Sequence, residues 1–131
     1  MFSFEHKIRV RYGETDQMGY CYYGNYAEFL EIGRVETLRA LGVSYKKIEI
    51  SGIMLPVVEL NIKYIKPSFY DDLLTIKTII NKKPSVKIEF EYEIYNEKKE
   101  LLTKAYTKLV FVDKKNMKPC GCPKELLLKF N

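Results

Sequence analysis

The stretch GETDQMGYCYYGNYAEFLEIGR, residues 13–34, begins as a loop and continues as a long helix. Two glycines punctuate the loop over residues 13–22. From about 23 to 41 apolar residues recur at three- and four-residue spacings, which predicts a helix with one buried face, and Gly42 marks its end. Gly33 lies in that face although glycine is a poor helix former, so we expect another element to pack closely over it. The other members of the face are Tyr26, Phe29, Leu30, Thr37, Leu38 and Leu41.

Strands are predicted on both sides of this helix. Residues 3–12 and 86–94 alternate apolar and polar side chains, the period of a half-buried strand. The remaining elements are a short helix over 44–51, strands ending at Pro67 and spanning 71–80 and 101–113, and a helical turn over 123–130. A single long helix must bury its apolar face against the sheet, so the sequence predicts an α+β fold in which antiparallel strands wrap around the helix. An edge strand and apolar residues on the outer sheet face favour dimerisation; these residues are Tyr106, Val110 and Val112.

Length and composition describe a single domain spanning residues 1–131, large enough for a core of its own. Apolar residues make up 47% and charged residues 30%, which is typical of a soluble globular protein. The chain has no apolar run of about 18 residues, and its N-terminus lacks the apolar region of a signal peptide. Three cysteines, an odd number, fit a reducing compartment. These features predict a cytoplasmic protein without a membrane span.

The formal net charge of +5 is compatible with nucleic acid, but the basic residues are interspersed with carboxylates and form no stripe. We therefore expect no nucleic-acid partner, because the same balance suits a small phosphorylated ligand. In the turn NKKPS, Lys82, Lys83 and Ser85 are candidates to hold phosphates. The alternative is that these lysines are solvated and protect the strand edges.

Several catalytic patterns are missing from the sequence. His6 is the single histidine and fits the alternation of the first strand, so no Ser–His–Asp or Cys–His arrangement is predicted. The CGC at 120–122 lacks a second ligand pair for zinc, and no glycine-rich phosphate loop is present. Catalysis would then rest on carboxylates, backbone dipoles or a Tyr, Lys or Cys side chain, with no metal and no cofactor.

Asp16 precedes the helix, where free N–H groups and the positive end of the helix dipole gather. Those groups can hold an oxyanion while a carboxylate attacks a carbonyl or activates water. The alternative is that Asp16 caps a turn with its own side chain, and the residues alone leave both possibilities open. Cys21 has no histidine near it in sequence and is interpreted as a packing residue. Glu59 interrupts an apolar run, and on an inward strand face its carboxylate would require a partner or a function.

Two segments of the chain resemble the hot-dog-fold acyl-CoA thioesterases of the 4-hydroxybenzoyl-CoA thioesterase type. That family shows T-D-x-x-G, an aromatic stretch ending in N-Y, and a helix with F-x-E-x-x-R. The matching residues here are Thr15, Asp16, Gly19, Asn25, Tyr26, Phe29, Glu31 and Arg34. The family's second segment, Y-x-x-P…D-D-x-L-x-I-x-T, is matched by Tyr64, Pro67, Asp71, Asp72, Leu74 and Thr78. The resemblance covers nearly the whole chain up to about Asp113.

The resemblance implies a hot-dog fold, in which a five-stranded antiparallel sheet wraps around the long central helix. It also implies that two subunits pair their sheets, often assembling further into a homotetramer, and that acyl-CoA binds at the dimer interface. By the same resemblance Asp16 is the nucleophile or general base, and the backbone N–H of Tyr23 polarises the thioester carbonyl.

The remaining expected substrate contacts also follow from the resemblance. They are Gly19, Asn25 and Tyr26 in the motif, Glu59 from the second subunit, and the basic hairpin with Lys82, Lys83 and Ser85 at the CoA phosphates. The chain departs from many relatives at Gly24, where they have a histidine, although the 4-hydroxybenzoyl-CoA type lacks that histidine too.

The predicted reaction is hydrolysis of an acyl-CoA to the free acid and CoA. One alternative is a non-catalytic protein of the same fold that binds acyl-CoA or acyl-carrier protein. Another is a hydratase or dehydratase, and His6 argues against it because such relatives generally pair a histidine with an acidic residue. The sequence leaves open which acyl group is bound.

Overall fold

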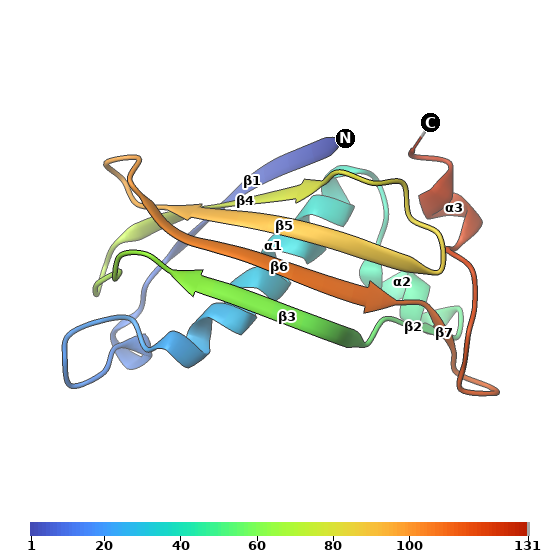
Figure 1. The fold of residues 1–131 in the computed structure, drawn as a ribbon, viewed down its shortest axis with the longest axis horizontal. Helices are drawn as coiled ribbons and strands as arrows, with labels where there is room; N and C mark the ends of the chain where they lie inside the picture. The colour runs from blue at the N-terminus through green and yellow to red at the C-terminus, as the bar shows by residue number, and fades with distance from the viewer. Residues whose placement is uncertain (131) are drawn as a thin grey trace.

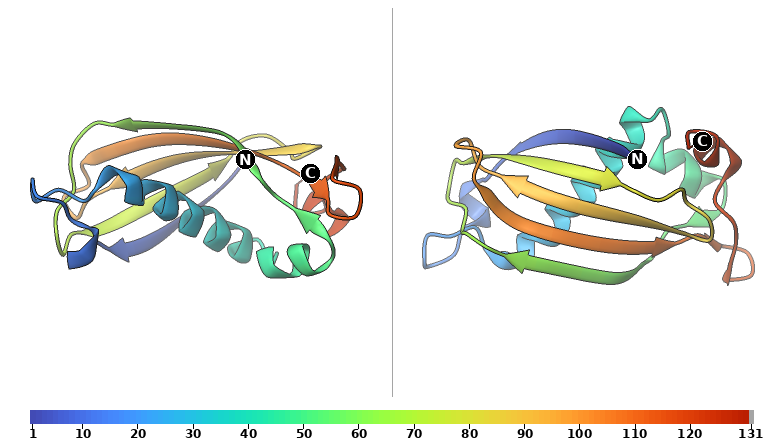
Figure 2. Two further views of the ribbon diagram at one scale, coloured as in Figure 1. Left: turned by 90° about the horizontal axis from the view of Figure 1, so that it is seen from below. Right: turned by 45° about the horizontal axis from the view of Figure 1, so that its top comes forward.

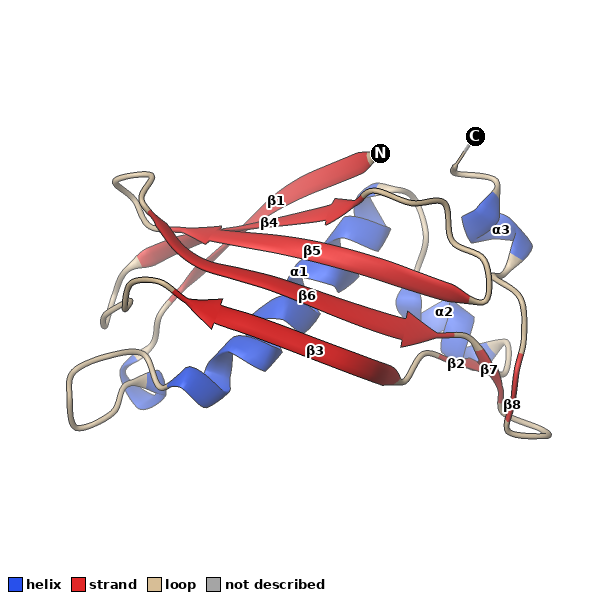
Figure 3. Cartoon of the chain, viewed as in Figure 1, coloured by secondary structure: helices blue, strands red, loops and turns tan. Residues whose placement is uncertain are grey.

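A five-stranded antiparallel sheet is the main body of the protein, for which a computed structural model describes residues 1–130. Figures 1 and 3 show its strands side by side, and each neighbouring pair runs antiparallel in the order β1-β4-β5-β6-β3. The strands are β1 (Phe2–Arg9), β3 (Val57–Tyr64), β4 (Leu73–Ile80), β5 (Lys87–Tyr95) and β6 (Leu101–Val110). The predicted α+β, five-stranded architecture is confirmed, and β1 and β3 form its two edges.

Helix α1 (Tyr26–Ala40) lies across one face of this sheet (Figure 2). It begins later than the periodicity predicts, because residues 23–25 form a separate 3₁₀ turn, η2 (Tyr23–Asn25). At Gly33 a Cβ atom would lie 2.8 Å from Ile76 Cγ2 and 2.7 Å from Thr78 Oγ1, so the expected close approach is confirmed. Gly42, with φ of +87°, ends the helix as predicted, in a conformation that favours glycine.

The alternation of β5 sets the two faces of the sheet. Ile88, Phe90 and Ile94 are buried toward α1, and the intervening glutamates lie on the outer face, as the sequence predicts. Tyr92 belongs to the inner row too, and its hydroxyl is 2.6 Å from the Thr107 hydroxyl of β6. The core therefore lies between the sheet and the helix.

A second, smaller sheet closes the far end of the fold. It contains β2 (Ile53–Met54), β7 (Val112–Asp113) and β8 (Lys118–Pro119). Helix α2 (Tyr45–Ile50) contacts β2, and α3 (Lys124–Leu127) follows β8 along the chain. Both helices were predicted, but the strand predicted over 101–113 is two strands. The chain leaves the main sheet after Val110, and the Phe111 N–H bonds to Val86 O. Val112 is thereby buried, so its expected place on the outer face is wrong.

Edge strand β3 is the most exposed strand of the main sheet. Val57, Val58 and Leu60 are each about half exposed on it. Among residues 1–130, no helix is long and apolar enough to cross a membrane.

Candidate active site

Asp16 lies in the loop between β1 and α1. Its Oδ1 accepts hydrogen bonds from the backbone N–H groups of Met18 (2.9 Å) and Tyr20 (3.2 Å). Its backbone carbonyl accepts from the N–H of Gly19 (3.0 Å), where φ is +81°. The turn-capping interpretation is therefore confirmed for one carboxylate oxygen. No donor within residues 1–130 bonds to the other oxygen, Oδ2, so one atom of the carboxylate remains free to react.

A second loop holds this first loop in place. Cys21 N–H donates to Ser68 O at 2.7 Å, in the loop between β3 and β4. Tyr20 forms an isolated antiparallel bridge with Phe69, and their rings pack edge to face with centroids 5.6 Å apart. Two loops distant in sequence therefore fix the position of Asp16 relative to α1.

The chain then enters α1 through η2, where backbone donors remain free. Within residues 1–130, the N–H groups of Tyr23 and Gly24 find no acceptor, whereas the N–H of Asn25 bonds to Tyr22 O. Unsatisfied N–H groups at the start of a helix are suited to bind an anion or a developing oxyanion.

Asp16 and Tyr23 line the same cleft, of about 250 Å³. Most of its wall is aromatic or aliphatic, and Lys66 contributes one cation; the lining comprises Asp16, Met18, Tyr20, Cys21, Tyr23, Tyr26, Tyr64, Ile65, Lys66 and Pro67. A mostly apolar cleft with a few convergent polar groups is typical of small-molecule sites. The structure therefore brings Asp16 and Tyr23, the two residues predicted to be catalytic, to one cleft.

Three tyrosines form the aromatic wall. The Tyr64 ring lies 5.2 Å from that of Tyr26 and 6.1 Å from that of Tyr23, both edge to face. The Tyr64 hydroxyl donates to Tyr23 O (3.1 Å), and the Tyr26 hydroxyl is 2.8 Å from Ser68 Oγ. Burial raises the pKa of the Tyr26 and Tyr64 phenols, so both are neutral near pH 7.

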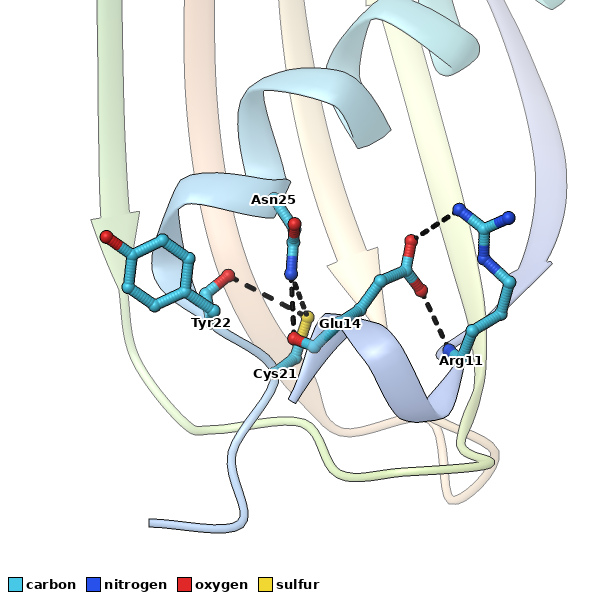
Figure 4. A network of polar contacts seen from close by, with 5 residues as sticks. All are labelled: Arg11, Glu14, Cys21, Tyr22 and Asn25. Carbon is cyan, nitrogen blue, oxygen red and sulfur yellow. Dashed lines mark hydrogen bonds and ion pairs between the residues drawn. The ribbon is translucent and has the colours of Figure 1, made fainter. Parts of the chain in front are cut away.

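Asn25 has a structural contact instead of facing the cleft. Its side-chain amide donates to Glu14 O (2.7 Å) and lies 3.9 Å from the Cys21 sulfur (Figure 4). Glu14 in turn accepts from the Arg11 backbone N–H and side chain. Burial acts to raise the pKa of Glu14, but these bonds to Arg11 outweigh it and hold that pKa below its usual value. This network ties the start of α1 to the end of β1.

Gly19 and Glu59 do not line the cleft either. Gly19 shapes the turn after Asp16. Glu59 alternates with Leu60, which faces α1, so its side chain lies on the outer face. There it forms an ion pair of 3.1 Å with Lys108, its neighbour in the β3–β6 ladder. An inward orientation of Glu59 is therefore wrong.

The basic hairpin between β4 and β5 lies at the opposite end of the sheet from the loop that follows β1 (Figure 1). Lys82, Lys83 and Ser85 follow the end of β4, whereas the Asp16 loop follows the end of β1, its antiparallel neighbour. Lys82 is 3.6 Å from Glu89, and Lys83 lies near the chain ends. Within one copy of the chain, this hairpin therefore forms no part of the cleft wall.

His6 and Cys21 have the predicted structural placements. His6 lies opposite Ile76 in the β1–β4 ladder and is not part of the cleft wall. Cys21 is buried, and burial raises the pKa of its thiol, which keeps it protonated. No group of three His, Cys, Asp or Glu side chains within residues 1–130 is placed to hold a metal ion.

Sequence reasoning missed a role for Tyr64 and its neighbours Ile65, Lys66 and Pro67. Tyr64 belongs to the second segment that resembles the family, but the sequence assigns it no function, and in the structure it forms one wall of the cleft. The signal was available in the alternation of β3, which places Tyr64 on the same face as Leu60.

Comparison with known proteins agrees with this fold and cleft. The family model described as "Thioesterase superfamily" matches residues 18–103. "Putative acyl-CoA thioesterase YneP" of Bacillus subtilis is 41% identical over 113 residues, 86% of this chain and 82% of the relative. Acyl-CoA thioesterase YbgC of Haemophilus influenzae is 33% identical over 130 residues, 98% of this chain and 95% of the relative. The crystal structure of a DHNA-CoA thioesterase from Staphylococcus aureus superposes with a TM-score of 0.89 at 39% identity, covering 92% of this chain and 81% of that one.

The fold and the cleft define a hot-dog protein with a carboxylate beside a helix N-terminus. The chain belongs to the thioesterase superfamily, and its expected fold and family are confirmed.

Proposed function

We propose that this protein hydrolyses the thioester of an acyl-CoA to the free acid and CoA, with Asp16 as its reactive carboxylate. One observation carries the proposal: Asp16, whose Oδ2 accepts no hydrogen bond within residues 1–130, and Tyr23, whose N–H has no acceptor there, line the same cleft. A carboxylate and an oxyanion donor in one apolar cleft are the two groups that thioester hydrolysis needs, because a thiolate leaves readily. The names of the relatives support the acyl-CoA class.

Two routes use these groups. In the covalent route, Asp16 Oδ2 attacks the thioester carbon, the C–S bond breaks with loss of the CoA thiolate, and water hydrolyses the acyl–Asp16 anhydride. In the general-base route, Asp16 takes a proton from water as that water attacks the same carbon, and the proton passes to the departing thiolate. In both routes the Tyr23 N–H donates to the carbonyl oxygen as negative charge develops on it. Neither route uses a metal or a cofactor.

The acyl group would lie along the aromatic wall of Tyr23, Tyr26 and Tyr64, beside the Asp16–Gly19 turn. Asn25 would act indirectly, by holding the entry to α1. Lys82, Lys83 and Ser85 would meet the CoA phosphates from another subunit.

The active assembly we propose is a homodimer that pairs β3 edges, extended to a homotetramer. Support comes from the exposed apolar residues Val57, Val58 and Leu60 on an unpaired edge strand. Glu59 lies on the same edge strand and would approach a cleft only from a neighbouring subunit. We place this assembly in the cytoplasm, because all three cysteines of the chain are free thiols.

Thiol release from a panel of aromatic and aliphatic acyl-CoAs tests the proposal, using the wild type, Asp16→Asn and Asp113→Asn. Asp113 is a matched control, because its Oδ1 also caps a turn, accepting from the Lys115 N–H at 2.8 Å, but it lies outside the cleft. We expect turnover by the wild type and Asp113→Asn, and its loss in Asp16→Asn. Binding of acyl-CoA without turnover by any of the three would instead support a non-catalytic binding protein.

A further inference from the structure

A second groove lies beside the cleft, between α1 and the edge strand β3. It measures about 300 Å³ and is lined by Ala27, Glu28, Leu30, Glu31, Arg34, Val57, Leu60 and Thr107. Ala27, Glu31 and Arg34 follow one another at helical spacing and form one stripe of α1. This stripe faces the same side as the edge that the proposed dimer would pair.

Arg34 is the unusual member of the stripe. Its side chain is only 7% exposed, and its Nε has no hydrogen-bond partner within residues 1–130. No carboxylate in that range lies within 4 Å of its guanidinium group. Burial raises the pKa of the Tyr92 phenol, and the nearby Arg34 charge opposes that rise. A largely buried arginine without a counter-charge is costly, so an anion from outside the described chain would stabilise it.

Glu31 lies one helical turn before Arg34, and it is exposed and likewise forms no ion pair within residues 1–130. The next Glu–Arg couple of the helix behaves differently. Glu36 and Arg39, at the same spacing of three residues, form an ion pair within the chain. The two couples also differ in burial, because Arg34 is buried whereas Arg39 is exposed.

Opposite charges three residues apart on one stripe are self-complementary across a two-fold axis. In an isologous dimer, a contact from residue i to residue j is repeated from j to i. Two antiparallel copies of α1 whose axis passes between residues 31 and 34 would therefore form both contacts at once. A small anionic ligand fits the groove less well, because Glu28 and Glu31 also line it and would repel an anion.

We propose that Arg34 pairs with Glu31 of the partner subunit, and Glu31 with Arg34 of the partner subunit, in two reciprocal ion pairs across the dimer axis. The inference rests on the proposed dimer and deepens it, since each copy completes a buried site of the other. Arg34 is thus an interface residue that fixes how two copies are aligned.

Charge reversal in two separate variants, Glu31→Arg and Arg34→Glu, tests these pairs. Each variant alone would place two like-charge contacts in its homodimer, which we expect to weaken association by about a hundredfold or more. A mixed dimer of the two variants restores opposite charges at both contacts. With two affinity tags and sedimentation or native mass measurement, we expect mixed dimers to exceed either homodimer by about tenfold or more.

The matched control is the in-chain pair. Glu36→Arg and Arg39→Glu have the same spacing and charges, so we expect neither of them to weaken the dimer and mixing them to have no effect. If Arg34→Glu does not fold by itself, the double variant Glu31→Arg with Arg34→Glu tests the proposed ion pairs instead, because it restores both pairs in a homodimer. Association of that double variant at wild-type strength is the expected result.

Two results would overturn the inference: no preference for mixed dimers together with a double variant that does not associate, or single variants that dimerise like the wild type. Thiol release by the wild type distinguishes a failure of the proposed ion pairs from a failure of the proposed function. If it hydrolyses acyl-CoA while mixing has no effect, the ion pairs are wrong and the proposed function stands. If mixed dimers form but no thioester is hydrolysed, the ion pairs stand and the proposed function fails.

Discussion

The turn that leads into α1 and the C-terminal half of α1 differ in how fully their side chains are packed and their polar groups hydrogen-bonded. In the C-terminal half, Leu38 is fully buried, Thr37 Oγ1 donates to Gly33 O at 2.7 Å, and Gly42 ends the helix. In η2, the turn that leads into α1, Tyr23 is largely exposed, and its N–H has no acceptor within residues 1–130. The helix is thus well packed, whereas the turn before it has unused hydrogen-bond donors, and that turn is where we place the chemistry.

The largest expected effect on stability is at the packed region. In Gly33→Ala, the new Cβ meets Ile76 Cγ2 at 2.8 Å and Thr78 Oγ1 at 2.7 Å, both on β4. Overpacking costs about 1–3 kcal/mol and the gain in helix propensity offsets about 1 kcal/mol, so we expect a net loss of up to about 2 kcal/mol. Urea unfolding of the wild type and of Gly33→Ala measures this change in the free energy of unfolding. In the control, Gly13→Ala, the added Cβ has no atom within 4 Å, and an equal loss there would contradict the packing explanation.

A smaller effect is expected at the open region, from Tyr64→Phe. The substitution removes the hydrogen bond to Tyr23 O but keeps the ring against Tyr26. We expect a loss of stability of about 0.5–1 kcal/mol and a fall in kcat/KM of a few fold, because the Tyr23 peptide is held less firmly. Tyr12→Phe is the control, since Tyr12 is 78% exposed and its hydroxyl has no partner within residues 1–130. If both variants behave alike, the Tyr64 hydroxyl does not position the site.

The smallest effect on turnover is expected from Cys21→Ala. The thiol lines the cleft, but burial raises its pKa, so it remains protonated near neutral pH and is a poor nucleophile. We expect kcat/KM within about twofold of the wild type. The two pH–rate profiles should also superimpose from pH 7 upward, because a thiolate mechanism would add a rate increase as pH rises through the raised pKa. A lost rate increase in Cys21→Ala would show that the thiol, and not Asp16, reacts.

Local pattern was sufficient to predict most of the fold. The three- and four-residue spacing predicted α1, and Gly33 within the apolar face predicted the close contact with β4. The order of the strands could not be read in the same way, because it depends on long-range pairing. Local pattern also could not predict that the chain leaves the main sheet after Val110, which buries Val112.

The site was predicted in part. Asp16 and Tyr23 are close in sequence, and a helix N-terminus explains why they share a cleft. Tyr64 is distant in sequence from Tyr23, at the end of β3. Its contribution to the site becomes visible only in the folded structure, where its ring packs against that of Tyr23. Whether Glu59 faces inward or outward depends on which residues of β3 alternate toward the core. The sequence could not show this, because the run around Glu59 is apolar on both faces and the strand register is irregular between Val57 and Glu59.

The central claim is that Asp16 serves chemistry and not stability. It is tested most directly by measuring kcat/KM and the free energy of unfolding on the same preparation of Asp16→Asn. Asparagine keeps an oxygen to accept from the Met18 and Tyr20 N–H groups, so we expect unfolding to change by less than about 0.5 kcal/mol. We expect kcat/KM to fall by about 10²- to 10⁴-fold. Wild-type turnover in this variant, or a fall in stability that accounts for the lost activity, would contradict the claim.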